Sequence, residues 1–403
     1  MSMKVEIAKS RAQGVIVAPP SKSYGHRLLI CAALAEGQSR LYRPGENQDI
    51  LATMDCLRAL GADIRTDGET VTVRGCGRHV SGGGFLPCRE SGSTLRFMIP
   101  VSLLGGGGCF GGTPRLISRG VGVYEQILPS HGAYVSVSGA SIRVCGSLSG
   151  GEYVIPGDVS SQFISGLMFA LPLLETDSRI KIVPPFESRA YVDMTADALA
   201  GYGIELRQEK DGVYFIPGRQ RYRPVDTAVE GDWSNAAFFY ALNALGGNIR
   251  VQGLRSDSRQ GDRICLDYLE RLSRPGAQLE LSDCPDLAPV LFAVAAAGNG
   301  ATFTGTRRLA IKESDRAAVM AQELAKFGAH VICGEDTVQV MPTGIHAPTE
   351  PLCGHNDHRV VMALSVLATQ TGAVLLGAEA VSKSYPDFFA ALAGLGVSVT
   401  ELT

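Results

Sequence analysis

Apolar positions along the chain follow two alternating patterns. Runs such as residues 28–34 and 290–297 are apolar on every side, which predicts buried helices. Other segments carry apolar residues at helical spacing and then alternate apolar with polar residues, which predicts an amphipathic helix followed by strands. Residues 63–73 alternate in this way around Asp67-Gly68, a pair typical of the turn of a β-hairpin.

Glycines end the amphipathic segments at regular intervals. Each follows the end of a predicted helix, where a residue in the left-handed conformation commonly closes the helix. Most of them lie about 70 residues apart, at Gly61, Gly132, Gly203, Gly276, Gly328 and Gly396. A polar cluster able to cap a helix precedes each glycine by about 40 residues, near Ser23, Ser93, Ser160, Ser234, Asp286 and Asp357. Two signals with a nearly constant offset predict six copies of one unit.

Each unit is expected to hold a buried helix, a strand, an amphipathic helix and a terminal hairpin. Such units predict an α/β or α+β fold with helices packed under sheets. The sixth unit is short of strands because the sequence stops at Thr403. Residues 4–8 and 14–17 precede the first cap and have no helix of their own, so we expect them to complete the last half of the chain.

The chain would therefore cross twice between two domains of three units each. We predict one discontinuous domain, residues 1–18 and 228–403, and one continuous domain, residues 19–227. Residues 218–224, which are rich in arginine and end in proline, are expected to form the return linker.

Composition and charge exclude several classes of protein. The 403 residues are 45% hydrophobic and 19% charged, which is ordinary for a globular protein of two or three domains. A net charge of -3 gives no general attraction to nucleic acid or to an anionic membrane. No apolar run approaches the roughly 20 residues that cross a bilayer, and no signal-peptide pattern is present. The ten cysteines are scattered without a C-x-x-C pair, as in a reducing compartment, so we expect a cytoplasmic protein.

The predicted helix starts carry the candidate chemistry. A helix N-terminus favours an anion by about 0.3–1 kcal/mol, and three of them in each domain would line a cleft that attracts polyanions. Arginine forks suit phosphate and carboxylate, and lysine acts as a point charge or a proton donor. The basic residues nearest the predicted caps and loops are Lys22, Arg27, Arg96, Arg119, Lys312, Arg316, Arg359 and Lys383.

Two carboxylates accompany these cations. Glu313 lies in Lys312-Glu-Ser-Asp-Arg316, where its charged neighbours would lower its pKa and prepare it to accept a proton. Asp286 precedes an apolar helix and is either an ordinary N-cap or a second carboxylate of the site. Together they make an acid/base pair chemically feasible.

Three further patterns bear on the chemistry that the sequence allows. Ser160 and Ser161 have no Gly-x-Ser-x-Gly elbow around them, so they suit hydrogen bonding to phosphate or hydroxyl groups better than nucleophilic attack. The glycine-rich residues 105–112 are not followed by Gly-Lys-Ser/Thr, which argues against a nucleoside-triphosphate loop. His355 and His358 lack a companion set of ligands, so no metal site is predicted.

Taken together, these motifs resemble the 3-phosphoshikimate 1-carboxyvinyltransferase family, also called 5-enolpyruvylshikimate-3-phosphate synthase. The resemblance spans essentially the whole length of the chain. The motifs that carry it, in order, are Pro20-Ser-Lys-Ser-Tyr-Gly-His-Arg27, Ser91-Gly-Ser-Thr-Leu-Arg96, Arg119, Asp158-Val-Ser-Ser-Gln162, Pro185-Phe-Glu-Ser-Arg-Ala-Tyr191, Asp286, Lys312-Glu-Ser-Asp-Arg316, Asn356-Asp-His-Arg359 and Ser382-Lys-Ser-Tyr-Pro-Asp387.

The resemblance implies a fold and an activity. The fold would have two domains of three βαβαββ repeats each, of an inverse α/β barrel-like kind. The activity would be a metal-independent transferase reaction of the shikimate pathway and aromatic amino acid biosynthesis, with no cofactor. It would transfer the enolpyruvyl group of phosphoenolpyruvate to the 5-hydroxyl of shikimate 3-phosphate, through a tetrahedral ketal, and release phosphate. The partners would be these two small molecules, and the enzyme would be a monomer.

The resemblance also implies a set of site residues. Shikimate 3-phosphate would contact Lys22, Ser23, Arg27, Ser160, Ser161, Ser188, Asp286 and Lys312. Phosphoenolpyruvate would contact Lys22, Gly92, Arg119, Gln162, Arg316, Arg359 and Lys383. Asp286 is assigned to the attacking hydroxyl, and Glu313 and Lys22 share delivery of a proton to C3 of phosphoenolpyruvate and its later removal.

The sequence departs from the family pattern in places, and two alternatives stay open. Glu90 and Arg308 stand where the family often has asparagine; an arginine at 308 would still be able to contact a phosphate. The first alternative is the related enolpyruvyl transferase that acts on UDP-N-acetylglucosamine, whose reactive cysteine lies in a region corresponding to that of Cys109. The second is a non-catalytic anion-binding scaffold of the same fold.

Overall fold

Packing contacts divide the chain into two units. The computed structural model describes residues 3–402. The continuous unit comprises residues 20–230, and the discontinuous unit comprises residues 1–19 and 231–403. The chain therefore passes between units at 19/20 and at 230/231, against expected positions of 18/19 and 227/228. Among the residues described, no helix has both the length and the apolar character needed to span a bilayer.

The continuous unit contains three four-stranded sheets of one topology. In each, counted in sheet order, the first strand is parallel to the second, and the third is antiparallel to the strands on both sides of it. The strands, in sheet order, are β6 (Phe85–Pro87), β7 (Gly107–Gly111), β9 (Ser141–Gly146) and β8 (Ala133–Ser138); β10 (Gly151–Pro156), β11 (Ser178–Val183), β13 (Val213–Ile216) and β12 (Arg207–Lys210); and β14 (Thr227–Ala228), β3 (Gln38–Tyr42), β5 (Thr70–Arg74) and β4 (Asp63–Asp67).

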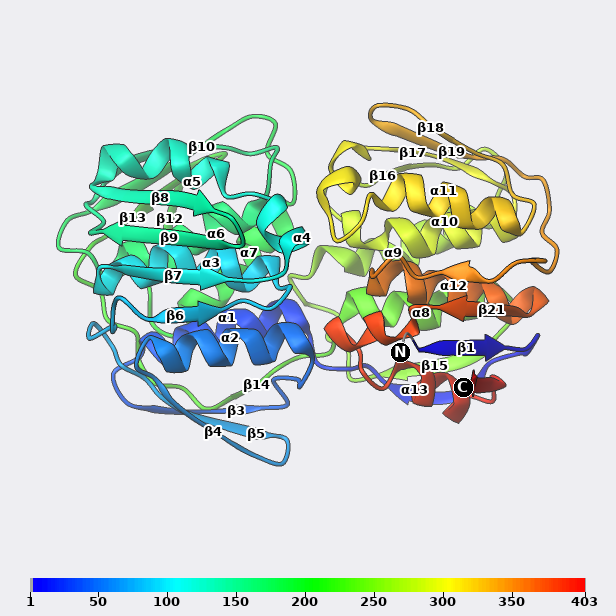
Figure 1. Cartoon of the computed structure of the whole chain (residues 1–403), viewed down its shortest axis with the longest axis horizontal. Coiled ribbons are helices and arrows are strands. Elements are labelled where there is room, and N and C mark those ends of the chain that lie inside the picture. Colours follow the sequence, from blue (N-terminus) through cyan, green and yellow to red (C-terminus); the bar gives the residue numbers. More distant parts are fainter. Residues whose placement is uncertain (1–2, 403) are drawn as a thin grey trace. The chain divides into compact units, whose positions relative to one another are not determined.

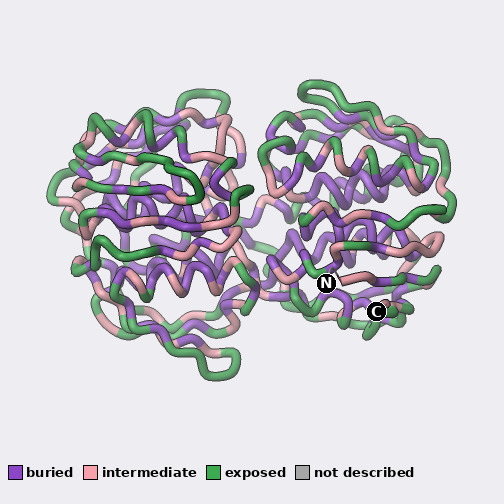
Figure 2. Tube along the Cα trace, in the orientation of Figure 1, coloured by how far each residue is buried: buried purple, intermediate pink, exposed green. Residues whose placement is uncertain are grey.

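Two kinds of helix accompany these sheets. The helices of the continuous unit are α1 (Lys22–Leu34), α2 (Gln48–Ala59), α3 (Gly92–Ser102), α4 (Pro114–Ser118), α5 (Gly122–Ile127), α6 (Ser161–Ala170) and α7 (Arg189–Gly201). Of these, α1, α3 and α6 are buried along most of their length, whereas α2 and α7 bury one face. Figure 2 shows the buried trace along the helices and the exposed trace along the hairpins of each unit.

The discontinuous unit repeats the arrangement with strands from both ends of the chain. Its sheets, in strand order, are β16 (Gln278–Glu280), β17 (Ala301–Thr304), β19 (Thr337–Val340) and β18 (Val331–Cys333); β20 (Leu352–Cys353), β21 (Ala373–Leu376), β1 (Lys4–Ile7) and β22 (Val399–Leu402); and the pair β15 (Asn248–Gln252) and β2 (Gln13–Val17). Its helices are α8 (Trp233–Ala244), α9 (Cys265–Leu272), α10 (Ala288–Ala297), α11 (Arg316–Lys326), α12 (His358–Thr371) and α13 (Phe388–Gly394). Figure 1 shows β1 beside β21.

The N-terminal strands complete the C-terminal half, as predicted. β1 lies between β21 and β22 and is antiparallel to both, and β2 runs parallel to β15. The strand that precedes α8, β14, pairs instead with β3 of the continuous unit. At each crossing of the chain, the strand before the crossing therefore stays in the sheet of the unit that the chain is leaving.

The six predicted units are present, but one lacks its hairpin. Chain order in the regular units is strand, buried helix, strand, amphipathic helix and hairpin, which is an α/β fold. After α9, the chain enters β16 directly, and β16 pairs with β17 of the following sheet. The prediction of a terminal hairpin was therefore wrong for the fourth unit among the residues described. Its sheet is the two-stranded pair of β15 and β2.

The glycine positions were predicted correctly, and the caps only in part. All six glycines expected to close a helix have positive φ, between 73° and 106°. Ser160 and Asp357 are N-caps. In the clusters near Ser23, Ser93 and Ser234, the capping residue lies two positions earlier, since Ser21, Ser91 and Asp232 accept the N–H of the first turn. Asp286 does not cap α10 but lies in the 3-10 turn Pro285–Leu287.

The expected return linker is part of the continuous unit. Within residues 218–224, Tyr222 is buried and donates its hydroxyl to Phe169 O at 2.7 Å, and the Arg219 N–H bonds to Leu174 O at 2.7 Å. The assignment of this segment as a linker was therefore wrong.

Truncating a buried side chain of β1 tests the role of this strand. Ile7 is fully buried between β21 and β22, so Ile7→Ala is expected to lower the free energy of unfolding by about 2–4 kcal/mol. Glu6→Ala, at the exposed neighbouring position of the same strand, is the matched control and is expected to change it by less than about 0.5 kcal/mol. Urea unfolding followed by circular dichroism measures both, and equal effects would show that β1 contributes no core packing.

Candidate active site

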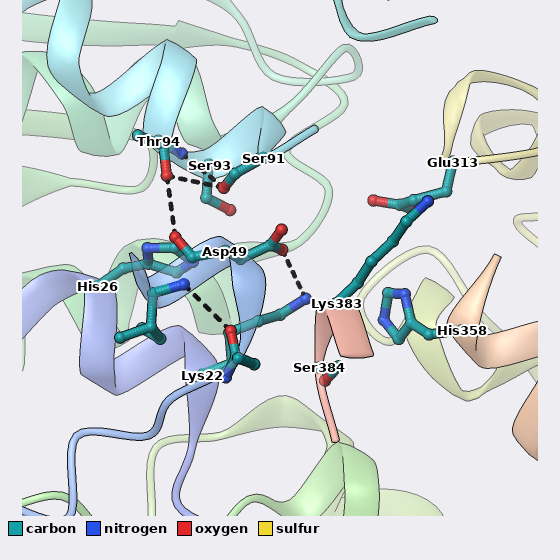
Figure 3. A network of polar contacts seen from close by, with 12 residues as sticks. Lys22, His26, Asp49, Ser91, Ser93, Thr94, Glu313, His358, Lys383 and Ser384 are labelled. Carbon is teal, nitrogen blue, oxygen red and sulfur yellow. Dashed lines mark hydrogen bonds and ion pairs between the residues drawn. The ribbon is translucent and has the colours of Figure 1, made fainter. Parts of the chain in front are cut away.

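The start of α1 places a lysine against a carboxylate. Pro19 and Pro20 end the preceding extended segment, and Ser21 caps the helix. Lys22 then projects from the first turn, and its Nζ lies 2.9 Å from Oδ2 of Asp49, in the first turn of α2. Both side chains are 14% exposed, so this ion pair lies near the surface of the continuous unit, at the helix starts (Figure 3).

A buried chain of hydroxyl groups joins the starts of α2 and α3. Nδ1 of His26 lies 2.7 Å from Oγ1 of Thr53, which in turn lies 2.7 Å from Oγ1 of Thr94. Oγ1 of Thr94 also lies 2.7 Å from Oγ of Ser91 and 3.3 Å from the carbonyl oxygen of Asp49 (Figure 3). Burial is the main cause that lowers the pKa of His26 well below its usual value, so the imidazole is neutral in this chain of contacts.

Arg119 packs against Gly92, the first residue of α3. A methyl group added to Gly92 would lie 3.1 Å from Nη1 and 3.2 Å from Cζ of Arg119. Gly92 therefore leaves room for this guanidinium beside the free N–H groups of the helix start, an arrangement suited to a carboxylate or phosphate.

Arg96 links α3 to two other predicted site residues. Its Nη1 donates to Oε1 of Gln162 at 2.7 Å, and its Nη2 donates to the carbonyl oxygen of Arg119 at 3.2 Å. Gln162 makes a second contact with α3, because its Nε2 donates to Oγ of Ser93 at 2.9 Å. Ser160 caps α6, the helix of Gln162, by accepting the Gln162 N–H. The contacts of Gln162 with Arg96 and Ser93 therefore fix the starts of α3 and α6 to each other.

Arg27 is buried, and its guanidinium is bonded within the protein. It donates to Oγ1 of Thr195 at 2.9 Å, to the carbonyl oxygen of Ser23 at 2.7 Å and to that of Tyr191 at 2.8 Å. Burial lowers its pKa to about 10. Its neighbour α7 begins after Ser188, a buried residue with a positive φ of 54°, a costly conformation that needs support from its surroundings.

In the discontinuous unit, three cations surround Asp286. Its Oδ1 lies 2.8 Å from Nη1 of Arg316 and 3.4 Å from Nζ of Lys312, and its Oδ2 lies 3.5 Å from Nη2 of Arg359. Burial opposes ionisation of this carboxyl, but the combined charge of the three cations holds its pKa well below its usual value. Burial lowers the pKa of Lys312, and the nearby positive charge of Arg316 adds to this effect.

Arg316 is shared by three carboxylates. Besides Asp286, its Nη2 bonds to Oε2 of Glu313 at 2.8 Å and its Nε bonds to Oδ2 of Asp357 at 2.9 Å. Asp357 is fully buried and also accepts the Ser314 hydroxyl at 3.0 Å and the Arg359 N–H at 2.9 Å. The first residue of α11 and the cap of α12 are therefore joined by one guanidinium.

Two side-chain nitrogens of Arg359 make no hydrogen bond to the residues described. Its side chain is 3% exposed, yet its Nε and Nη1 have no hydrogen-bond partner among the residues described. Buried arginine N–H groups are rarely left unpaired, because each costs about 1–3 kcal/mol. A carboxylate or phosphate placed against these donors would remove that cost, and an acceptor of this kind is what the geometry calls for.

Lys383 and Asp262 lie around the same cluster. Nζ of Lys383, at the end of the 3-10 turn Ala378–Lys383, donates to the carbonyl oxygen of Asn356 at 2.6 Å. Asp262 is buried and accepts the Ser234 hydroxyl at the start of α8. Burial, with the charge of Asp286, raises the pKa of Asp262 to about 6.

The predicted residues thus form two groups, and most of them lie at helix starts, although Arg119 ends α4 and Lys383 ends a 3-10 turn. The group in the discontinuous unit is joined by direct contacts and comprises Asp286, Lys312, Glu313, Arg316 and Arg359, with Lys383 tied to the turn before α12. The group in the continuous unit comprises Lys22, Ser23, Arg27, Gly92, Arg119, Ser160, Ser161, Gln162 and Ser188. The approach of one group to the other stays a prediction.

Sequence reasoning missed several residues that hold this site. Asp49, Asp262 and Asp357 each pair with a site residue or lie in its electrostatic range. Asp357 was seen only as a helix cap, and Asp49 and Asp262 were not singled out. No signal in the sequence marked Asp49, because α2 carries none of the predicted cations and the partner of Asp49, Lys22, lies on α1.

The chain matches one family model over nearly its full length. The model is that of EPSP synthase (3-phosphoshikimate 1-carboxyvinyltransferase), and it matches residues 7–280 and 270–392. A 3-phosphoshikimate 1-carboxyvinyltransferase from Clostridium acetobutylicum is 39% identical over 426 residues, and one from Clostridium kluyveri is 38% identical over 424 residues; both alignments cover 98% of each chain. The chain belongs to the EPSP synthase family.

Solved structures of similar fold agree with this assignment. An EPSP synthase from Acinetobacter baumannii superposes with a TM-score of 0.83 at 22% sequence identity and covers 100% of both chains. At this identity the likeness concerns the fold alone, and it confirms the predicted mixed α/β class. The family assignment confirms the resemblance inferred from the motifs, and it makes the chain a transferase of the shikimate pathway.

The pKa of Asp262 predicts a pH-dependent gain in stability for Asp262→Asn. The native carboxyl holds its proton up to about pH 6, whereas an unfolded one loses it near pH 4. Ionising Asp262 in the native state therefore lowers the free energy of unfolding progressively as the pH rises from about 4 to about 6, and the loss reaches its maximum above pH 6. Asn keeps a hydrogen-bonding group for Ser234 without the charge. We expect a gain of about 1–3 kcal/mol at pH 7 and almost none at pH 4.

Urea unfolding at pH 4, 5, 6 and 7 measures this effect. Asp267→Asn, which removes an exposed carboxyl of α9, serves as the control and should show no such dependence. A gain for Asp262→Asn that is equal at pH 4 and pH 7 would contradict the raised pKa.

Proposed function

We propose which residues of this chain perform the steps of the family reaction. That reaction, which this chain catalyses, transfers the enolpyruvyl group of phosphoenolpyruvate to the 5-hydroxyl of shikimate 3-phosphate and releases phosphate. The hydroxyl oxygen bonds to C2 while a proton adds to C3, which gives a tetrahedral ketal. Loss of a proton from C3 and of phosphate from C2 then restores the double bond.

The observation that carries the proposal is the pair of unpartnered donors on Arg359. In the proposed complex, an anionic group of phosphoenolpyruvate lies against Nε and Nη1 of this buried guanidinium. Arg316 and Lys383 supply neighbouring positive charge, and Gly92, Arg119, Gln162 and Lys22 supply the contacts from the continuous unit. Ser23, Arg27, Ser160, Ser161, Ser188 and Lys312 bind shikimate 3-phosphate in this proposal.

Asp286 is the proposed base for the attacking hydroxyl. As it stands, its three cationic neighbours make it a weak base. Substrate anions bound to Lys312, Arg316 or Arg359 would draw positive charge away from this carboxylate and raise its pKa. Binding of the substrates would thus prepare the base, since a general base works best when its pKa lies near the working pH.

Glu313 and Lys22 are proposed to share the proton that moves to and from C3. Glu313 is partly exposed and bonded to Arg316, so it can turn toward a ligand while its charge stays compensated. Lys22 is bonded to Asp49 at a helix start. Each proton transfer by a positioned group is worth about 10²–10⁴ in rate.

The proposal includes the setting of the enzyme. It acts as a monomer in the cytoplasm, without metal or other cofactor, and binds neither nucleic acid nor membrane. His355, for which no metal site is predicted, bonds through Nε2 to Oε1 of Glu323 at 2.8 Å. The family match favours the shikimate reaction over transfer to UDP-N-acetylglucosamine and over a scaffold without activity.

The experiment that tests the reaction measures phosphate release from phosphoenolpyruvate and shikimate 3-phosphate, with each substrate omitted in turn. Release that requires both substrates is expected. Phosphate release supported by UDP-N-acetylglucosamine instead of shikimate 3-phosphate would contradict the proposed acceptor. No phosphate release with either acceptor would favour a non-catalytic anion-binding scaffold.

Asp286→Asn tests the base. Removing the carboxylate that accepts the hydroxyl proton is expected to lower kcat by about 10²–10⁴ while the KM of shikimate 3-phosphate changes little. Steady-state phosphate release measures both constants. Asp283→Asn, an exposed aspartate three residues earlier, is the matched control and should leave kcat within a factor of two. Retention of more than a tenth of kcat by Asp286→Asn would reject Asp286 as the base.

Gly92→Ala tests the contact between α3 and Arg119. The added methyl group would displace the guanidinium and is expected to raise the KM of phosphoenolpyruvate about tenfold, with a smaller effect on kcat. Gly201→Ala, whose added methyl group meets open space at the end of α7, is the control. An unchanged KM in Gly92→Ala would show that Arg119 does not bind this substrate from its present position.

A further inference from the structure

The turn that leads into α12 has an unusual backbone. Between β20 and α12, His355 has φ 49° and Asn356 has φ 53°, so two consecutive non-glycine residues adopt the left-handed conformation. Each costs on the order of 1 kcal/mol or more and persists only where the surroundings impose it. Something outside the turn must therefore hold residues 353–357 in place.

Glu323 of α11 is the group that holds this turn. Its side chain is fully buried, and it accepts the backbone N–H of Cys353 at 2.9 Å and Nε2 of His355 at 2.8 Å. Its remaining contact is Nζ of Lys326 at 2.9 Å. A buried carboxylate is costly unless its oxygens are paired, so the donors of the turn and Glu323 stabilise each other.

The turn presents the anion-binding cations. The carbonyl oxygen of Asn356 accepts Nζ of Lys383 at 2.6 Å. The next residue, Asp357, caps α12 and holds Arg316 at 2.9 Å. Arg359 follows in the first turn of α12. A change in the backbone at His355 and Asn356 would therefore shift the partners of Lys383 and Arg316 and the start of the helix that carries Arg359.

We propose that Glu323 and His355 are positioning residues for phosphoenolpyruvate binding, acting through the left-handed turn at His355 and Asn356. This inference rests on the proposed function, in which Arg359, Arg316 and Lys383 hold that substrate. Neither Glu323 nor His355 touches the substrate. Their effect falls on the KM of phosphoenolpyruvate, because they fix the place of three cations that bind it.

Two substitutions at one position separate support of the turn from loss of a side chain. His355→Ala and His355→Gly both delete the imidazole, but only glycine adopts φ near 50° without cost. We expect His355→Ala to raise the KM of phosphoenolpyruvate about 5- to 20-fold and His355→Gly to raise it by no more than about half of that factor. The KM of shikimate 3-phosphate should stay within a factor of two in both variants. His346→Ala, which deletes an exposed imidazole from the same unit, is the matched control.

The carboxylate itself is tested by Glu323→Gln, which keeps the shape and loses the charge. We expect Glu323→Gln to raise the KM of phosphoenolpyruvate. The double variant Glu323→Gln/His355→Ala is expected to raise this KM by less than the product of the two single effects, because both residues act on one turn. Melting temperatures establish that the variants are folded. Should Glu323→Gln fail to fold, the comparison of the His355 variants decides the matter, since this side chain is partly exposed.

The outcomes distinguish the inference from the proposed function. If Lys383→Met raises the KM of phosphoenolpyruvate and the His355 variants do not, the positioning role is wrong and the substrate site stands. If Lys383→Met and Arg359→Lys both leave this KM unchanged, the substrate site itself is wrong. Equal effects of His355→Ala and His355→Gly would overturn the role of the left-handed turn, as would equal changes in the KM of both substrates.

Discussion

The arrangement of the discontinuous unit depends on the buried guanidinium of Arg316. Asp286, Glu313 and Asp357 approach it from a 3-10 turn, a loop and a helix cap that are far apart in sequence. A buried charge would be expensive alone, and the paired arrangement offsets this cost only while the geometry is good. The starts of α11 and α12 and the turn before α10 are therefore constrained to one relative position.

This pairing also shapes how the site would receive anions. Three carboxylates face the positive charges of Lys312, Arg316 and Arg359, so the cluster is close to neutral before substrate arrives. An anionic ligand would compete with those carboxylates for the same donors, whereas the spare donors of Arg359 need no such exchange. In the proposed complex, the contacts with Arg359 are therefore the ones that require no existing ion pair to break.

The sequence predicted local features better than long-range pairings. Few residue types other than glycine adopt the left-handed conformation that closes a helix. Positions such as Gly132 and Gly328 were therefore predicted correctly. A polar cluster located the start of a helix but not the capping residue within the cluster, because several polar side chains compete there, as Ser21 and Ser23 do. Arg316 lies 41 residues from its partner Asp357 along the chain, and Arg96 lies 66 residues from its partner Gln162. No periodic pattern along the chain specifies such a partner, so these contacts became visible only in the folded structure. Motif resemblance supplied the site residues that pattern alone did not.

The place of β1 has a consequence for the order of synthesis. This strand is synthesised well before its two neighbours, which are residues 373–376 and 399–402. The continuous unit is complete by residue 230 and can fold while translation continues, because domains generally fold as units from the N-terminal side. β1 therefore has no partner on either edge until β21 has been made, and its second edge stays open until β22 follows. The synthesis of β22, rather than that of β21, then sets when the sheet that contains β1 can be completed.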